Sequence, residues 1–288
     1  MGVIQTEIDV SGQHSKLPVL RIDARSGWLA LDLAELWAYR ELLYFFVWRD
    51  IKIRYKQTVI GAAWAILQPL MTMLVFSLFF GRLAKIPSQG LPYPIFYYCA
   101  LLPWTYFATA MQAATNVVVE QQRVITKVYF PRVILPISSV VSGLLDFVIS
   151  FVVLICMMLY YRIVPTKAVI WLPFYTLLAV LTALGVGLWL SALNALYRDV
   201  RYVLPFLVQF WMFASPVAYP SSLVPAKWRG LYGLNPMAGV IEGFRWALTG
   251  HGQPPGVLLV ASSAAVVLLV LGGLIYYHAV EGKIADVV

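Results

Sequence analysis

The segment Trp48-Arg49-Asp50-Ile51-Lys52-Ile53-Arg54-Tyr55-Lys56-Gln57 precedes a stretch, residues 59–80, that contains no charged residue. About 20 apolar residues in a helix cross the hydrocarbon core of a bilayer, so this stretch predicts a membrane span. Lys and Arg residues beside a span favour the cytoplasmic side. We therefore predict that the span begins in the cytoplasm, with positive charge where an anionic lipid headgroup would lie.

The composition of the whole chain is that of a membrane protein. Of the 288 residues, 61% are hydrophobic and 12% are charged, and the mean hydropathy is +0.79. A soluble domain does not need so much apolar surface. The net charge of +8 would suggest nucleic-acid binding in a soluble protein. Here the basic residues flank apolar runs, so we interpret the charge as a signal for membrane orientation.

Six apolar runs predict an all-α, polytopic fold with six transmembrane helices. The fifth run is short because the pair Ser215-Pro216 interrupts it. The predicted spans cover approximately residues 59–80, 95–119, 137–161, 168–193, 203–218 and 257–279.

The segments around the spans predict three parts of the chain. Residues 1–27 are expected to form a mobile cytoplasmic tail, and residues 28–57 an amphipathic interface helix with a basic gate segment. Residues 58–288 are expected to form the transmembrane domain. Within it, residues 219–255 are too apolar for a solvated loop and too broken for one span, which favours re-entrant extracytoplasmic helices. Most of the 21 Lys and Arg residues then lie on one side, which predicts that both termini are cytoplasmic.

The sequence offers little catalytic chemistry. There is no Gly-rich phosphate-binding loop, the three His residues are scattered, and no Ser or Cys lies in a recognisable nucleophile motif. We predict no catalytic residue, no metal site and no cofactor bound by this chain. If the chain moves a cargo uphill, the energy must come from a partner or an ion gradient. Asp146 is the clearest ionisable residue inside a span, either as a proton relay or as an acid that is hydrogen-bonded within the bundle or to another subunit.

A series of motifs in a fixed order runs along most of the chain. They are the segment 48–57, Gly61, Trp64 and Gln68-Pro69; Leu102-Pro103-Trp104 with Phe107; Lys127-Val128-Tyr129-Phe130-Pro131-Arg132 with Leu135-Pro136; Asn194 with Tyr197-Arg198-Asp199; Ser215-Pro216-Val217 with Tyr219; and Tyr232 with Asn235-Pro236. With these motifs the chain resembles the membrane (permease) subunits of polysaccharide ABC exporters of the ABC-2 type. It is most similar to the O-antigen type, with capsule and teichoic-acid permeases as near relatives. The extension before Trp28 is longer than is usual in that family.

The resemblance implies a homodimer of six-span subunits bound to two copies of a separate ABC ATPase. The ATPase would bind ATP and Mg, so this chain would be a transport subunit and not an enzyme. Such exporters move undecaprenyl-pyrophosphate-linked polysaccharide outward across the bacterial inner membrane. The cargo of this chain would be O-antigen, or capsule or teichoic acid.

The four cations of the gate segment are candidates for contact with the substrate's pyrophosphate at the cytoplasmic entrance. They are Arg49, Lys52, Arg54 and Lys56. Arginine can bind phosphate with two parallel hydrogen bonds, and lysine provides a mobile point charge. The alternative is that they only anchor the topology and contact lipid.

Two cytoplasmic loops are candidates for docking the ATPase, because a partner that changes shape must push on rigid elements. The candidate residues are Arg123, Lys127, Tyr129, Phe130, Pro131, Arg132, Arg198 and Asp199. The alternative is that their charges only set the orientation.

A sugar polymer also needs a pathway that binds each unit weakly, which aromatic faces provide. The pathway candidates are Tyr97, Tyr98, Trp104, Tyr106, Phe107, Trp211, Phe213 and Tyr219, with interfacial belts as the alternative.

Residues 219–255 are predicted to form an outer gate over this pathway, or else a packing lid that does not move. Glu242 and Arg245 are one helical turn apart and are expected to pair.

The sequence also leaves two rival functions. One is an ABC-2 permease for a drug or a simple lipid. The other is an intramembrane enzyme, which would require clustered acids or histidines at one depth.

Overall fold

Helices make up all the regular structure of the residues that the computed structural model describes, which are 33–56, 61–252 and 254–287. These residues belong to one unit, Leu31–Val288. The predicted all-α class is confirmed over the described ranges. The predicted tail, residues 1–27, lies outside them, and the division of the chain into three parts stays a prediction.

The elements follow one another with short connections. The first half contains α1 (Leu33–Ala38), α2 (Arg40–Lys56), α3 (Gly61–Phe76), the π-helical η1 (Ser77–Leu83), α4 (Tyr93–Glu120), α5 (Gln122–Ile125), α6 (Ile134–Ser142) and α7 (Leu144–Tyr160). The second half contains η2 (Lys167–Trp171), α8 (Leu172–Leu196), α9 (Val200–Ala214), η3 (Ser221–Leu223), η4 (Ala226–Trp228), α10 (Arg229–Tyr232), α11 (Pro236–Thr249) and α12 (Gly256–Val287).

Four helical segments in the described residues are long and apolar enough to cross a membrane. They are Ala63–Leu83, Ile134–Tyr160, Lys167–Leu196 and Gly256–Gly282, which correspond to the first, third, fourth and sixth predicted spans. The second predicted span coincides with α4, which has 28 residues but carries Tyr, Gln and Asn side chains that lower its hydropathy. The fifth coincides with α9, an apolar helix of 15 residues. The chain is therefore a multi-pass membrane protein, and the count of six spans stays a prediction.

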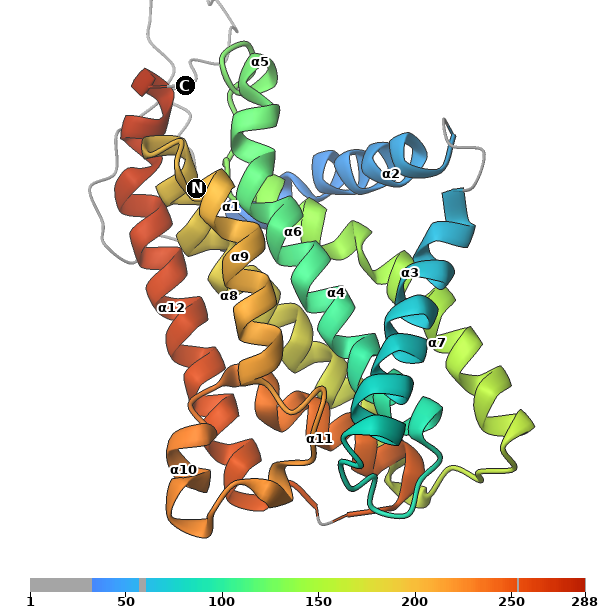
Figure 1. The fold of residues 1–288 in the computed structure, drawn as a ribbon. Helices are drawn as coiled ribbons and strands as arrows, with labels where there is room; N and C mark the ends of the chain where they lie inside the picture. The colour runs from blue at the N-terminus through green and yellow to red at the C-terminus, as the bar shows by residue number, and fades with distance from the viewer. Residues whose placement is uncertain (1–32, 57–60, 253, 288) are drawn as a thin grey trace, which may run out of the picture. The chain divides into compact units, whose positions relative to one another are not determined.

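Helix α4 lies in the middle of the bundle. It contacts α3, α6, α7, α8, α9 and α11, and residues 95–104 of α4 are all buried. In Figure 1, α3 and α7 lie on one side of α4, and α8, α9 and α12 lie on the other. A helix surrounded in this way can be lined with large aromatic side chains that pack on several neighbours at once.

Helices α8 and α12 pack closely because glycine removes the side chains between them. A Cβ atom on Gly273 would lie 2.7 Å from the carbonyl oxygen of Gly185, and one on Gly185 would lie 3.0 Å from the backbone nitrogen of Val270. Glycines on the facing sides therefore let these two membrane helices approach one another.

Helix α2 runs transverse to α3 and α4, at the same end of the bundle as α5 and the C-terminal end of α12 (Figure 1). Phe46 is buried against Phe130, while Tyr44, Phe45 and Trp48 are exposed. The predicted helix is therefore present from Leu33 on, with a short break between α1 and α2. Its location in the membrane interface stays a prediction.

The segment 219–255 lies at the opposite end and forms η3, η4, α10 and α11. Helix α11 begins where the side chain of Asn235 accepts a hydrogen bond from the N–H of Met237 at 3.1 Å, and ends at Gly250 with φ of 68°. Almost every residue of α11 is buried against α4, α8 and α12. Its backbone is thus covered by protein, as irregular segments at membrane depth require, but the re-entrant path stays a prediction.

Candidate functional site

The four cations of the gate segment lie in the second half of α2 and fall into two classes. Lys52 and Lys56 are exposed, and the Lys52 ammonium lies 5.3 Å from the centre of the Trp48 ring. Arg49 donates to a carboxylate oxygen of Asp50 at 2.8 Å and to the side-chain carbonyl of Gln121 at 3.2 Å. Two of the four cations therefore present their charge at the surface. Arg49 also ties α2 to the end of α4.

Arg54 is paired with an acid from another helix. Its guanidinium donates to one carboxylate oxygen of Asp146 in α7, and the Tyr55 hydroxyl donates to the other. Burial and the neighbouring Asp146 carboxylate both raise the pKa of Tyr55. The interpretation of Asp146 as an acid hydrogen-bonded within the bundle is therefore confirmed.

A cavity of about 300 Å³ opens beside this pair, among α3, α4 and α7. Its polar lining consists of Arg54, Asp146, Gln68, Thr105, Thr109 and Ser150. The remaining wall is apolar and is made by Trp64, Ala65, Pro69, Leu102, Tyr106 and Phe147. The lining thus combines an ion pair of one cation and one acid with amide and hydroxyl groups and rings, a mixture that suits an amphipathic ligand with a polar group.

The predicted docking loop divides into exposed and buried residues. Arg123, Lys127 and Tyr129 are exposed, and Tyr129 keeps 71% of its accessible surface. Phe130 is buried under α2, where its ring centre lies 5.6 Å from that of Phe46. The loop therefore exposes Tyr129 and its cations while Phe130 anchors it to α2.

Arg132 connects the same loop to α12. Its N–H donates to a carboxylate oxygen of Glu281 at 3.0 Å, its guanidinium donates to the Glu281 carbonyl, and its own carbonyl accepts from the Tyr277 hydroxyl at 3.2 Å. Pro131 is half-buried between these anchors. In the second loop, Arg198 and Asp199 are exposed between α8 and α9.

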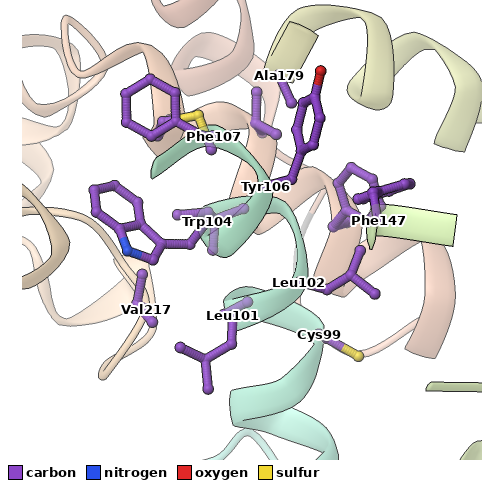
Figure 2. Close-up of a cluster of buried hydrophobic side chains, with 14 of the residues drawn as sticks. Cys99, Leu101, Leu102, Trp104, Tyr106, Phe107, Phe147, Ala179 and Val217 are labelled. Atoms are coloured by element: carbon purple, nitrogen blue, oxygen red, sulfur yellow. The ribbon is translucent and has the colours of Figure 1, made fainter. Parts of the chain in front are cut away.

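The five pathway candidates of α4 are core residues within one chain. Figure 2 shows Trp104 and Phe107 on one side of α4, and Tyr106 beside Phe147 on another. Tyr97, Tyr98 and Phe107 have no accessible surface, and Trp104 and Tyr106 keep only 3%. In the described conformation none of these rings presents an open face, so their contact with a sugar stays a prediction.

Helix α9 carries an aromatic stripe that the sequence prediction mostly missed. Tyr202, Phe206, Phe210 and Phe213 are 78%, 72%, 66% and 46% exposed. Of these only Phe213 was predicted. Their spacing of four, four and three residues places them on one helical face, and this spacing was the signal available in the sequence.

A second cavity, of about 420 Å³, lies at the end of α9 against the segment 224–235. Its walls are Trp211, Ala214, Val224, Trp228, Leu231, Tyr232 and Asn235. Trp211 was predicted as a pathway residue, whereas Trp228 and Tyr232 were not. Aromatic residues that gather in a Pro- and Gly-rich segment were the available signal.

The polar atoms around this aromatic cavity bond to one another. The Trp211 indole N–H donates to the Asn235 side-chain oxygen at 3.0 Å, and Asn235 donates to the Ser215 hydroxyl at 2.9 Å. The hydroxyls of Tyr219 and Tyr232 are 3.1 Å apart, and burial raises the pKa of Tyr232. The cavity is thereby left with ring faces and alkyl groups as its surface.

Helix α11 is held by a buried ion pair. Arg245 donates to Glu242 at 2.9 Å and to the carbonyl of Pro216 at 2.9 Å, and its guanidinium carbon lies 3.9 Å from the centre of the Phe96 ring. Glu242 also accepts from the N–H of Ser221 at 2.7 Å. The predicted pair is confirmed, and it joins α11 to α4 and to the segment 216–221. Over the ranges described, no three His, Cys, Asp or Glu side chains gather as a metal site would require.

The chain is similar to known proteins of one family over most of its length. The sequence model of the family described as "ABC-2 type transporter" matches residues 41–249, which include the gate segment, both loops and α11. The chain is 33% identical, over 79% of its length and 87% of the relative, to the O-antigen export system permease protein RfbA of Myxococcus xanthus. It is 25% identical to an RfbA of Klebsiella pneumoniae over 71% of this chain and 79% of that protein. It is 24% identical to the polysialic acid transport protein KpsM of Escherichia coli over 67% and 76%.

Proposed function

The chain belongs to the ABC-2 type transporter family, and we propose that it is the permease subunit of an ATP-driven exporter of undecaprenyl-pyrophosphate-linked polysaccharide. The observation that carries this proposal is the similarity to an O-antigen export permease over 87% of that relative's length. The cargo is O-antigen or a capsule-type or teichoic-acid polymer. The protein lies in the bacterial inner membrane with six spans and both termini in the cytoplasm.

The proposed assembly is a homodimer of this chain with two copies of a separate ABC ATPase that binds ATP and Mg. The docking surface is the exposed part of the loop 121–132, with Arg198 and Asp199 beside it. This loop suits the role because it is anchored at two points. Phe130 packs on α2, and Arg132 is hydrogen-bonded to α12. Force applied to Tyr129 would therefore reach both helices.

At the cytoplasmic entrance, the cations of α2 contact the pyrophosphate of the lipid carrier. Lys52 and Lys56 are exposed and supply the long-range attraction. Arg49 and Arg54 are held by Asp50 and Asp146 near the same surface. A guanidinium group can form directional hydrogen bonds with phosphate oxygens.

Along the pathway, aromatic rings stack on the apolar faces of sugars. The exposed stripe of α9 offers successive rings, and the aromatic cavity at its end adds Trp211, Trp228 and Tyr232. Weak contacts of one kind, repeated along a helix, let a polymer slide without a deep energy well. In the homodimer, the α9 stripes of the two copies would face the same conduit, with the segment 219–255 as its outer gate.

The proposal is tested by transport from reconstituted vesicles. The chain is reconstituted with its ATPase, and the movement of undecaprenyl-pyrophosphate-linked polysaccharide is measured with ATP. The matched control is an ATPase whose hydrolysis is inactivated by mutation. We expect transport only with active ATPase and ATP. Equal transport with the inactive ATPase would contradict the proposal, and transport of simple lipids alone would favour the rival lipid permease.

A further inference from the structure

Asp146 is an acid in the first turn of a helix that carries no other charged residue. An ionisable side chain in a membrane-spanning helix is unfavourable unless it is paired, and such residues mark functional sites. Both carboxylate oxygens of Asp146 are used, one by Arg54 and the other by Tyr55. Asp146 therefore joins the end of α2 to α7, across 92 residues of sequence.

The pair between Arg54 and Asp146 remains accessible. The Arg54 side chain is 38% exposed and that of Asp146 is 26% exposed, and both lie in the wall of the 300 Å³ cavity. A partly hydrated ion pair is weaker than a buried one, because water screens it and solvates the separated ions. An anion that enters the cavity can therefore compete with Asp146 for Arg54.

We propose that this cavity binds the phosphate group of the lipid-linked substrate and that Asp146 occupies Arg54 until the phosphate displaces it. The inference rests on the proposed function, from which it takes the phosphate-bearing substrate. A pyrophosphate carries more negative charge than a carboxylate and offers more acceptor oxygens to a guanidinium. Gln68, Thr105 and Thr109 line the same cavity and provide further polar groups for the ligand.

The exchange also changes what holds α2. When phosphate takes the place of Asp146 on Arg54, the end of α2 loses its ionic contact with α7 and keeps the hydrogen bond from Tyr55 to Asp146. The other end of the helix stays packed on the docking loop through Phe46 and Phe130. Ligand binding in the 300 Å³ cavity thereby changes how α2 is held, and α2 contacts the loop on which the ATPase would dock.

The first test measures the sign of a mutational effect on binding. Farnesyl pyrophosphate is the probe, and it is titrated against the full-length chain in phosphatidylcholine nanodiscs. We expect Asp146→Asn to bind it about tenfold more tightly than the unmodified chain, and Arg54→Gln about tenfold more weakly. The double variant should bind like Arg54→Gln, because Asp146 acts through Arg54.

Two controls accompany the titration. Glu120→Gln removes an exposed acid at the end of α4 that does not line the cavity, and it should change the affinity by less than about twofold. Farnesol lacks the phosphates and should not compete with the probe. Binding by Asp146→Asn that is equal or weaker would overturn the exchange. Tighter binding that persists in the Arg54→Gln background would also overturn it, because it would mean simple charge repulsion.

The second test keeps Asp146 intact, so it does not depend on the folding of that variant. Nitroxide labels are placed on α2 and α7 through Ile53→Cys and Val152→Cys, both at exposed positions, with the exposed Cys156 replaced by Ser. The distance between the labels is measured by pulsed electron paramagnetic resonance. Farnesyl pyrophosphate should lengthen or broaden the distance distribution, and farnesol should leave it unchanged. An unchanged distribution with bound probe would overturn the release of α2.

The outcomes separate this inference from the proposed function. If the unmodified chain binds no farnesyl pyrophosphate, the phosphate contact itself fails, and the exchange fails with it. If it binds and Asp146→Asn does not bind more tightly, only the exchange fails. Transport by the chain with its ATPase is decided independently by the vesicle experiment.

Discussion

Arg245 illustrates how a charged residue is accommodated inside this bundle. Its side chain has no accessible surface, and its charge is balanced by Glu242, the Pro216 carbonyl and the face of Phe96. A buried cation is tolerated only when hydrogen bonds and an opposite charge replace its hydration. Arg245 also connects α11 to the loop at Pro216 and to the central helix α4.

We predict that Arg245→Met strongly destabilises the protein. The substitution leaves Glu242 as an uncompensated buried charge, and breaking a buried pair in this way typically costs about 3–5 kcal/mol. The double variant Arg245→Met with Glu242→Leu should recover part of the loss, because no buried charge is left. Thermal unfolding of the detergent-purified proteins measures both. A double variant as unstable as the single one would show that the hydrogen bonds, and not the unpaired charge, are decisive.

Tyr55 is expected to lose its proton at a higher pH than an ordinary tyrosine. Burial and the Asp146 carboxylate raise its pKa above the usual 10.0, because both disfavour the phenolate. The protonated hydroxyl therefore stabilises the fold below pH 10, and this contribution is lost as the pH rises through the higher folded-state pKa. In an alkaline titration followed by tyrosinate absorbance, Tyr55→Phe should lack one ionisation step that the unmodified protein shows. That step should lie at a higher pH than the ionisation of exposed tyrosines. A step missing near pH 10 would contradict this.

Helices α8 and α12 show how an element is placed by what its residues lack. Gly185 and Gly273 let the two backbones meet, since a Cβ atom on Gly273 would overlap the Gly185 carbonyl. Close backbone contact of this kind gains dispersion energy over a long interface, which is the main source of helix association in a membrane. The hydropathy of both segments predicts spans. The positions of the glycines indicate which faces of the two helices can make close contact.

We predict that Gly273→Ala destabilises the protein while Gly282→Ala does not. The first substitution forces the helices apart, an overpacking effect of roughly 1–3 kcal/mol. The second adds a methyl group where nothing lies within 4 Å and improves helix propensity. Unfolding temperatures of the two variants decide the matter. Equal temperatures would show that α12 can shift at little cost.

The docking loop is the element on which the proposed coupling depends. Tyr129 is expected to be a binding hot spot because it is a large, exposed ring on an anchored segment. Tyr129→Ala should weaken the affinity for the ATPase about tenfold. Tyr160→Ala removes a ring that is 82% exposed at the end of α7 and serves as the control. Affinity measured by biolayer interferometry in detergent should fall only for the first variant, and an equal effect of both would argue against this loop.

The two ends of the bundle differ in chemistry. The end with α2 and α5 carries exposed cations and the accessible Arg54–Asp146 pair. The end with α11 is held by side-chain hydrogen bonds and presents aromatic rings around a cavity. Between them, α9 presents its aromatic stripe along one face. This order suits a cargo whose charged head is recognised first and whose sugars follow.

We predict that the double variant Phe206→Ala, Phe210→Ala slows polysaccharide transport several-fold without unfolding the protein. Both rings are largely exposed in one chain, so their loss removes stacking contacts and little core packing. Leu268→Ala with Leu271→Ala on α12 removes comparable exposed apolar surface and should leave the rate unchanged. Transport in vesicles measures both rates, and equal slowing by the two pairs would assign the stripe to lipid contact.

Much of the fold could be predicted from local pattern. The apolar runs and their flanking cations correspond to helices, and the described parts of residues 28–57 and 219–255 contain helices as expected. The pair Glu242 and Arg245 was predicted because it is local, one helical turn apart. The partner of Arg54 was not, because Asp146 lies 92 residues away and nothing in the local sequence selects it.

The amino-acid sequence alone was enough to predict the membrane class and the helical elements, because hydropathy and short-range periodicity act within a single helix. The family resemblance came from the order of the motifs along the chain. Which rings are buried in α4, which are exposed on α9, and which acid neutralises Arg54 could be seen only in the folded protein. Those outcomes depend on the way helices pack side by side, and packing selects among faces that are equally apolar in the sequence.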